Sequence, residues 1–169
     1  INRNALPRAR EICGVLRSVV FSPEDLAIVK GDPADRRAFL DQLVITRWPR
    51  MAGVKSDYDR VLKQRNTLLK SLAGKGSRSV DETDLITLEV WDEHLARVGA
   101  ELLSARLDTL AELMPRASEA YASIAPTNNV ATAEYKTSLD ISPGAAEEPG
   151  REFLERRLRE AMLDRRKDE

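Results

Sequence analysis

The sequence predicts a mainly α protein, organised as a long antiparallel helical hairpin or arm with short flanking strands. Charged residues make up 33% of the 169 residues and aromatic residues only 5%. That composition suits helix pairs packed through Leu, Val, Ile and Ala. Apolar residues recur at helical spacing over residues 54–72 and again over 84–124. The stretch between them, AGKGSRS at 73–79, contains two glycines and predicts the loop of the hairpin.

Residues 21–41, FSPEDLAIVKGDPADRRAFLD, predict a junction between a strand and the first helices. The preceding run SVVF, at 18–21, is typical of a strand buried on both faces. Ser22 followed by Pro23 predicts a capped helical turn, and Asp32 followed by Pro33 predicts the next cap. A buried strand needs neighbouring strands, and this chain offers few. We therefore expect a piece of a larger protein whose sheet lies elsewhere.

Two helices are expected before the hairpin loop. The first, about 35–48, is predicted to end near Pro49. The second, about 54–72, has a coiled-coil-like seam that Arg65 interrupts, with Val61 and Leu68 flanking it. The apolar positions predicted to face inward are Phe39, Leu40, Leu43 and Val44 in the first helix and Tyr58, Leu62, Leu69 and Leu72 in the second.

One long helix is predicted over 84–124, about 60 Å at 1.5 Å per residue. Its apolar seam changes register near Leu102 and Leu103, a rotation of roughly 100°. We expect the first part to pair with the helix before it and the second with the helix at 35–48. Pro115 is a potential bend or break. The seam runs through Leu88, Trp91, Leu95, Val98 and Leu102, and then through Leu103, Leu107, Leu110, Met114, Ala117, Tyr121 and Ile124.

The remainder predicts an exposed strand at 130–139, a loop, and a final helix at 152–166. Phe153, Leu154, Leu158 and Met162 are expected to face inward on that helix. The predicted organisation is a connecting segment and strand at 1–22, a helical arm domain at 23–126, and a returning strand, loop and helix at 127–169.

The net charge of −1 is unevenly distributed. Residues 1–76 carry 15 Lys and Arg against 8 Asp and Glu, whereas residues 77–148 carry 5 against 14. A basic half joined to an acidic half is expected when one part faces a polyanion. It is also expected when two faces neutralise each other across a helix pair. Charge alone favours neither interpretation.

Basic residues recur over some 40 residues with few aromatic side chains among them, which suits phosphate contacts better than base stacking. A solvated helix face explains the same pattern. The predicted DNA-contact residues are Lys30, Arg36, Arg37, Arg47, Arg50, Lys63, Arg65 and Lys70.

No familiar catalytic or metal-binding pattern is present. The chain has no glycine-rich phosphate loop and no zinc-ligand spacing. His94 lies among acidic residues and is interpreted as structural or solvent-facing. Cys13 cannot form an internal disulfide, which fits a reducing compartment. No run approaches the roughly 18 apolar residues of a membrane span, and no signal-peptide pattern begins the chain.

Two runs within residues 19–70 carry a resemblance to a known family. PEDLAIVKGDPADRRAFLD, from Pro23, and YDRVLKQRNTLLK, from Tyr58, are similar to signatures of the RecF family of DNA replication and repair proteins, relatives of the SMC ATPases. The run TLEVWDEHLARVGAELLSAR, from Thr87, resembles the same family less sharply.

The resemblance implies a helical lobe inserted into an ABC-type head that binds ATP and Mg²⁺. In the family the Walker A loop lies upstream of this segment, and the signature and Walker B motifs lie downstream. The segment alone is therefore expected to bind no cofactor and to have no ATPase activity, while its parent is expected to be a weak ATPase. The implied setting is cytoplasmic and nucleoid-associated, in recombination and the SOS response to DNA damage.

The resemblance also implies partners and a hinge. The partners are single-stranded or junction DNA, other recombination-mediator proteins and a second copy joined through ATP-bound heads, with no membrane. Pro23 and Glu24 fall where SMC relatives have the Pro-Gln of the Q-loop, which senses the γ-phosphate and its metal. Glu24 is the candidate for that role, although helix capping explains it equally. Arg36 and Arg37 follow at the spacing of the SMC basic pair.

The leading interpretation is a DNA-contacting arm that carries the nucleotide state of the head through Glu24. A structural protein–protein interaction module without direct DNA contact is the alternative. An independent enzyme is the weakest interpretation, because no nucleophile and base can be paired.

Overall fold

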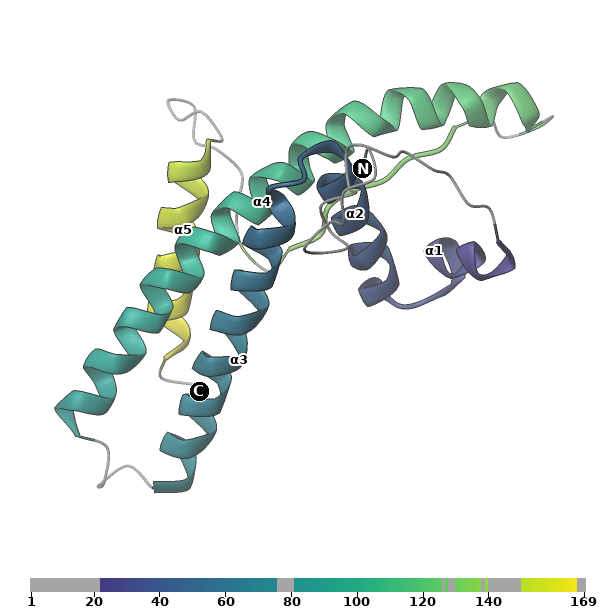
Figure 1. The fold of residues 1–169 in the computed structure, drawn as a ribbon. Coiled ribbons are helices and arrows are strands. Elements are labelled where there is room, and N and C mark those ends of the chain that lie inside the picture. The colour runs from purple at the N-terminus through teal and green to yellow at the C-terminus, as the bar shows by residue number, and fades with distance from the viewer. Residues whose placement is uncertain are drawn as a thin grey trace, which may run out of the picture. The chain divides into compact units, whose positions relative to one another are not determined.

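The computed structural model describes residues 22–75, 81–125, 127, 130–137, 139 and 150–166. Within them the chain forms helices joined by turns and irregular segments (Figure 1). The predicted strand at 18–21, Cys13 and residues 76–79 of the predicted loop lie outside the described residues, whereas residues 73–75, predicted to be loop, are helical. The chain divides into two compact units, Ile1–Gly53 with Ala105–Glu134 and Val54–Ser104 with Tyr135–Glu169. The mainly α prediction is confirmed.

The first unit begins with a short 3₁₀ turn, η2 (Pro23–Leu26), followed by α1 (Ala27–Lys30). The predicted capped turn is confirmed. The backbone N–H of Asp25 donates to the Ser22 carbonyl at 3.0 Å. In return the Asp25 carboxylate accepts the N–H of Ser22 at 2.8 Å. This reciprocal pairing satisfies donors that a helix start otherwise leaves without partners.

Helix α2 (Pro33–Arg47) starts and stops as the sequence predicts. Asp32 is its cap residue, and the Asp35 carboxylate accepts the Asp32 N–H at 3.0 Å. The N–H of Trp48 closes the last turn on the Val44 carbonyl at 2.8 Å, and Pro49 follows. Leu40 and Val44 are buried, as expected, whereas Phe39 lies at the edge with 36% of its surface exposed.

Helix α4 (Glu82–Ile124) has 43 residues, and those from Ala105 onward belong to the first unit. The unit boundary, between Ser104 and Ala105, follows the predicted seam rotation at Leu102 and Leu103, which are both buried. Ion pairs join α2 to this part of α4, so the predicted pairing of the second register with that helix is confirmed.

The prediction that the apolar residues of α4 face inward is wrong for the last turns of this helix. Tyr121 is 41% exposed and Ile124 is 79% exposed. Helix α2 ends at Arg47, level with Glu112, and so does not reach them. Pro115 lies inside the helix without dividing it, although proline has no N–H to donate to the carbonyl of Ala111.

The second unit is built from α3 (Met51–Lys75) from Val54 onward, the first part of α4, and α5 (Arg151–Arg165). Tyr58 of α3 lies against Gly99 of α4, and Arg65 binds Asp92. These two contacts are seven residues apart on both helices and in opposite order along them. The antiparallel hairpin is therefore confirmed, and Figure 1 shows its two helices side by side.

The predicted seam of α3 is confirmed in part. Leu72 is buried as predicted, and Arg65, which interrupts the seam, is 4% exposed. Leu62 and Leu69 are only half-buried, whereas Val61, predicted to flank the seam, is 0% exposed. On α4 the predicted first register is confirmed for Leu88, Leu95, Val98 and Leu102, which are buried, whereas Trp91 is half-buried.

Helix α5 places Phe153 and Leu154 in the core, as predicted, with Leu158 and Met162 half-buried. The predicted strand at 130–139 is not formed in its described part, because residues 130–137 are irregular. A strand requires ladder hydrogen bonds to a neighbour, and no other described segment is a strand. None of the helices in the described ranges is both long and apolar enough to cross a membrane.

Candidate functional site

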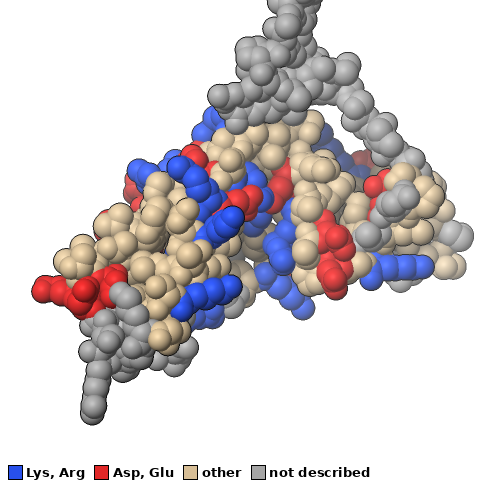
Figure 2. All heavy atoms as spheres, turned by 60° about the horizontal axis from the view of Figure 1, so that its bottom comes forward, with Lys and Arg blue, Asp and Glu red and all other residues tan. Residues whose placement is uncertain are grey.

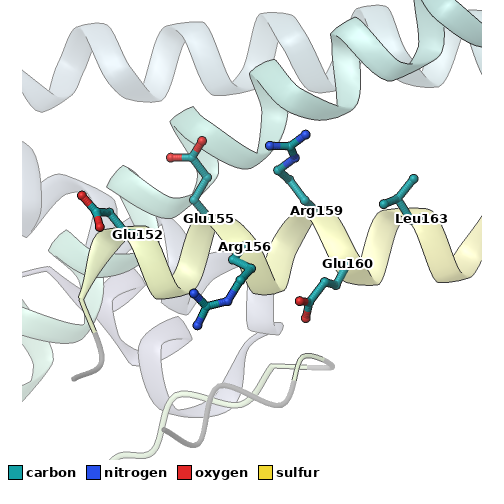
Figure 3. Close-up of a pocket in the computed structure, with 6 residues that line it drawn as sticks. All are labelled: Glu152, Glu155, Arg156, Arg159, Glu160 and Leu163. Carbon is teal, nitrogen blue, oxygen red and sulfur yellow. The ribbon is translucent and has the colours of Figure 1, made fainter. Parts of the chain in front are cut away.

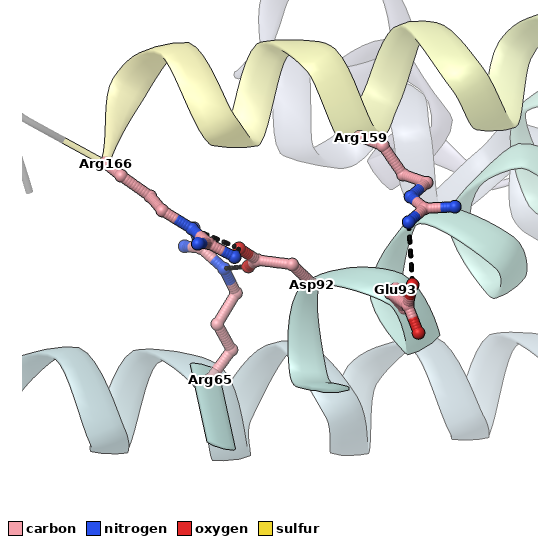
Figure 4. Close-up of polar contacts among 5 residues, drawn as sticks. All are labelled: Arg65, Asp92, Glu93, Arg159 and Arg166. Carbon is pink, nitrogen blue, oxygen red and sulfur yellow. Dashed lines mark hydrogen bonds and ion pairs between the residues drawn. The ribbon is translucent and has the colours of Figure 1, made fainter. Parts of the chain in front are cut away.

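Two buried charges and one partly buried charge meet in the second unit, from α3, α4 and the end of α5 (Figure 4). Arg65 Nε donates to Asp92 Oδ1 at 2.5 Å. Arg166, just after α5, donates to Asp92 Oδ2 from Nε at 3.0 Å and from Nη2 at 2.8 Å. The side chains of Arg65 and Asp92 are each 5% exposed, and that of Arg166 is 23% exposed. One carboxylate thus ties α3 and α5 to α4.

A second buried pair joins α2 to α4 in the first unit. Arg106 donates to Asp41 through Nε at 2.7 Å and Nη2 at 2.9 Å. This side-on bidentate arrangement matches the flat guanidinium to the flat carboxylate. Both residues are more than 90% buried. The pair therefore fixes which turn of α2 lies against which turn of α4.

Two further ion pairs, both exposed, join helices, one within each unit. Arg47 binds Glu112 in the first unit, and Arg159 donates to Glu93 at 2.6 Å in the second. The Arg47 hydrogen bond, helped by the charges of Arg47 and Arg116, holds the pKa of Glu112 below its usual value although desolvation opposes it. Arg47 and Arg65 of the basic half thus pair with Glu112 and Asp92 of the acidic half, as the neutralising-faces interpretation predicted, whereas Arg159 lies beyond both halves and Asp41 pairs with Arg106 in the opposite sense.

Two of the predicted DNA-contact residues, Arg47 and Arg65, form interhelical ion pairs. Arg65 is buried against Asp92, so a phosphate could reach it only if that pair opened. The Arg47 side chain is 34% exposed, binds Glu112, and stacks its guanidinium 4.1 Å above the Trp48 ring. Both lie on interhelical surfaces rather than on an open basic face.

The other predicted cations are exposed. Arg36 also donates to the Gly31 carbonyl at 2.9 Å, which ties it to the turn before α2. Figure 2 shows both basic and acidic side chains on the face in view. In the first unit the exposed cations are Lys30, Arg36, Arg37 and Arg50, and in the second they are Lys63 and Lys70.

The predicted hinge residues lie in η2, where Pro23 is exposed and Glu24 is the second residue. Helix capping was the competing explanation for Glu24. At the start of this turn the Asp25 carboxylate accepts the Ser22 N–H.

The described residues offer little that resembles a small-molecule site. A hollow of about 530 Å³ lies along α5 (Figure 3). Five of its six lining residues are charged, and all six come from this one helix: Glu152, Glu155, Arg156, Arg159, Glu160 and Leu163. Within the described ranges no three His, Cys, Asp or Glu side chains are grouped to hold a metal ion. His94 is half-buried, with its ring parallel to that of Trp91 at 6.5 Å.

The fold and its polar interior define a class of protein segment: a helical arm whose helices are joined by buried ion pairs. No protein-family model matches the chain. Over all of its length it is similar to proteins named DNA replication and repair protein RecF. The identity is 58% for Cutibacterium acnes, 52% for Streptomyces avermitilis and 50% for Kineococcus radiotolerans. The whole chain is thus similar to a segment of RecF proteins.

The match has a defined extent. The chain spans 45%, 44% and 44% of those three relatives, less than half of each. It is also similar to a solved structure described as the recombination mediator protein RecF-ATP in the RecFOR pathway. That match has a TM-score of 0.65 and 28% identity, and covers 94% of this chain and 40% of the other.

Proposed function

We propose that this chain is the helical arm of an ATP-binding DNA replication and repair protein. The supporting observation is its similarity, over its entire length, to RecF proteins at 50–58% identity. The solved relative described as RecF-ATP supports ATP binding by the parent protein. We place the connecting segment at 1–22, the arm at 23–126 and the returning segment at 127–169.

ATP and Mg²⁺ belong, in this proposal, to a head outside the segment. The chain has no phosphate loop that could hold a triphosphate. Its own contribution at the nucleotide is limited to the turn at Pro23 and Glu24. The parent protein is proposed to work in the cytoplasm at the nucleoid, with other recombination mediators and with a second copy joined through ATP-bound heads.

The arm contributes DNA contact through its exposed cations, while the buried pairs keep its helices in register. A cation that neutralises a phosphate releases a counterion, and each contact on duplex DNA steepens the salt dependence of binding by about 0.9. Lys30, Arg36, Arg37, Arg50, Lys63 and Lys70 are the candidates, because their side chains are exposed.

The test is DNA binding by the full-length parent as a function of salt. Replacing Arg36, Arg37 and Lys63 by Ala should lower the affinity and reduce the salt slope by roughly 2–3. The matched control replaces Arg97, Arg116 and Arg165 by Ala, three exposed cations outside the predicted set. Equal effects of the two triple variants would indicate a general charge effect and would contradict specific contact by the predicted residues.

Coupling to nucleotide is proposed to pass through Glu24, from its position in the turn that precedes α1 and α2. Glu24→Ala in the full-length protein should lower ATP turnover or ATP-driven dimerisation. Asp35→Ala is the control, since it removes a capping carboxylate at the start of α2. If Glu24→Ala matches the wild type in both assays, the residue has no nucleotide-sensing role.

A second candidate is a structural protein–protein interaction module without direct DNA contact. The pairing of Arg47 and Arg65 with Glu112 and Asp92 favours it, because it neutralises part of the basic half internally. Unchanged DNA affinity and salt slope in the Arg36, Arg37 and Lys63 variant would select this candidate.

A further inference from the structure

The outer face of α4 near its N-terminus carries a second apolar stripe. Leu85, Ile86 and Val90 are 49%, 55% and 58% exposed. The buried stripe of the same helix, through Leu88 and Leu95, faces the hairpin interior. Single exposed apolar residues are common on protein surfaces. Ile86 and Val90 lie one turn apart on one face (i, i+4), and Leu85 lies about 100° round the helix from Ile86, so α4 carries apolar residues outside its buried side as well.

Acidic residues flank this stripe. Glu82 lies one turn before it and Glu89 lies within it, both exposed. The chain has no Lys or Arg between Arg78 and Arg97. Among the described side chains at this end, the exposed cations include Lys70 on α3 and Arg165 on α5. The outer face of α4 is therefore both apolar and negatively charged.

The nearby acidic residues have other roles. Asp81 and Asp84 cap the helix, since the Asp84 N–H donates to the Asp81 carboxylate at 2.8 Å. Glu93 binds Arg159 of α5, and Asp92 binds Arg166, the residue after α5. No ion pair within the described ranges satisfies Glu82 or Glu89 in the same way.

Helix α5 adds a fourth apolar side chain at the same end. Arg151 pairs with Glu101 and Arg159 pairs with Glu93, eight residues apart on both helices and in opposite order. Leu163, 50% exposed, lies one turn beyond Arg159, and Figure 3 shows the two on the same side of α5. Val90 lies about one turn before Glu93, so Leu163 and Val90 are at matching levels.

We propose that Glu82, Leu85, Ile86, Glu89 and Val90, named here the α4 stripe, together with Leu163 dock an amphipathic helix of a partner protein. The occupant carries apolar residues at i, i+3 and i+4 spacing, flanked by Lys or Arg. The apolar groups provide the buried area, and Glu82 and Glu89 select a cationic helix over an acidic one. The proposal depends on the proposed arm role only in requiring that the hairpin be exposed in the parent.

The test is selection from a displayed library of 18-residue helical peptides, with the full-length parent protein as the target. Leu is fixed at i, i+3 and i+4, and the flanking positions are drawn equally from Lys, Glu and Gln. Enriched peptides should carry Lys flanks and bind more weakly as salt rises. Ile86→Ser with Val90→Ser should weaken binding at least tenfold, and Glu82→Gln with Glu89→Gln should flatten the salt dependence.

The matched control is Leu26→Ser with Val29→Ser, which replaces two apolar residues that are 59% and 80% exposed in the first unit. It should leave peptide binding unchanged. No enrichment, enrichment of Glu or Gln flanks, or binding that Ile86→Ser with Val90→Ser leaves intact would each overturn the proposal. Self-association of the parent that the same variant abolishes would identify a second copy as the occupant and overturn it too.

DNA binding separates this proposal from the proposed function. The α4 stripe variants should retain the affinity and salt slope of the wild type for DNA. A failure of DNA contact is detected by the variant of Arg36, Arg37 and Lys63, whose peptide binding should be normal. Each proposal can therefore fail while the other holds.

Discussion

Arg65 Nε lies 2.5 Å from Asp92 Oδ1, and both side chains are 95% removed from solvent. Burying two charges is unfavourable unless they pair and their remaining hydrogen-bonding atoms are satisfied. Asp92 meets this condition by accepting from Arg166 as well. The residue that interrupts the apolar seam of α3 is thus the residue that aligns α3 with α4.

Asp92→Asn should destabilise the second unit by about 3–5 kcal/mol, because it leaves the buried Arg65 and the partly buried Arg166 without their counter-charge. Urea denaturation followed by the fluorescence of Trp91, the neighbouring residue on α4, measures the change. Glu93→Gln is the control, since its pair with Arg159 is about half exposed on both sides. It should cost no more than about 1 kcal/mol. Equal costs for the two variants would show that burial adds nothing to the Asp92 interaction.

Arg106→Lys tests the bidentate geometry of the first unit. Lysine keeps the charge but cannot offer two parallel donors to Asp41. The expected loss is about 1.5–3 kcal/mol of unfolding free energy, the range for a charged hydrogen bond. Urea denaturation followed by Trp48 fluorescence is the measurement, and Arg47→Lys at the exposed pair with Glu112 is the control. Wild-type stability for Arg106→Lys would mean that charge alone maintains the contact.

Substitutions at Gly99 separate the contribution of helix propensity to stability from the contribution of packing. An ideal Cβ there would lie 3.5 Å from Tyr58 and from Leu158, an ordinary contact distance. Gly99→Ala should therefore stabilise the unit by up to about 1 kcal/mol, the gain expected for Ala in a helix interior. Gly99→Leu should instead cost about 1–3 kcal/mol through overpacking.

Gly53 provides the comparison, since nothing lies within 4 Å of its ideal Cβ. Gly53→Ala should stabilise, and Gly53→Leu should be tolerated far better than Gly99→Leu. Thermal denaturation of the four variants is sufficient to compare them. Similar melting temperatures for both Leu variants would indicate that α3, α4 and α5 can separate at Gly99 without cost.

The lowered pKa of Glu112 predicts a pH dependence with a definite sign. The carboxylate is held ionised by its hydrogen bond to Arg47, so its pKa is lower in the folded state than in the unfolded state. Its contribution to stability is present above the unfolded pKa and is lost as pH falls through the folded pKa. NMR titration of the Glu112 side chain should give a pKa that rises in Arg47→Ala. An unchanged pKa would mean that the pair does not persist in solution.

Local signals predicted the helices well because they act over a few residues. Asp32, Pro33 and Asp35 mark the start of α2 through capping, and Pro49 marks its end through a missing donor. The rotation of the seam at Leu102 and Leu103 predicted the exchange of helical partners. Each of these depends on the chemistry of neighbouring positions and is readable without a fold.

The interhelical pairs could not be assigned in the same way. Asp41 and Arg106 are 65 residues apart, and Asp92 and Arg166 are 74 residues apart. A charge on an apolar stripe, such as Arg65, signals that a partner is needed but does not identify it. The prediction of an exposed strand at 130–139 was wrong for a related reason. The alternation of side chains is a property of one segment, whereas a strand forms only when it pairs with a second one.

Asp92 has a consequence for how this segment can vary among its relatives. Its carboxylate serves positions 65 and 166 together, so a neutral residue at 92 is compatible only with changes at both arginine positions. Sequences should therefore change at 65, 92 and 166 as a set, whereas the exposed pair of 93 and 159 can drift independently. An alignment of RecF-family arms would show this as covariation among three helices.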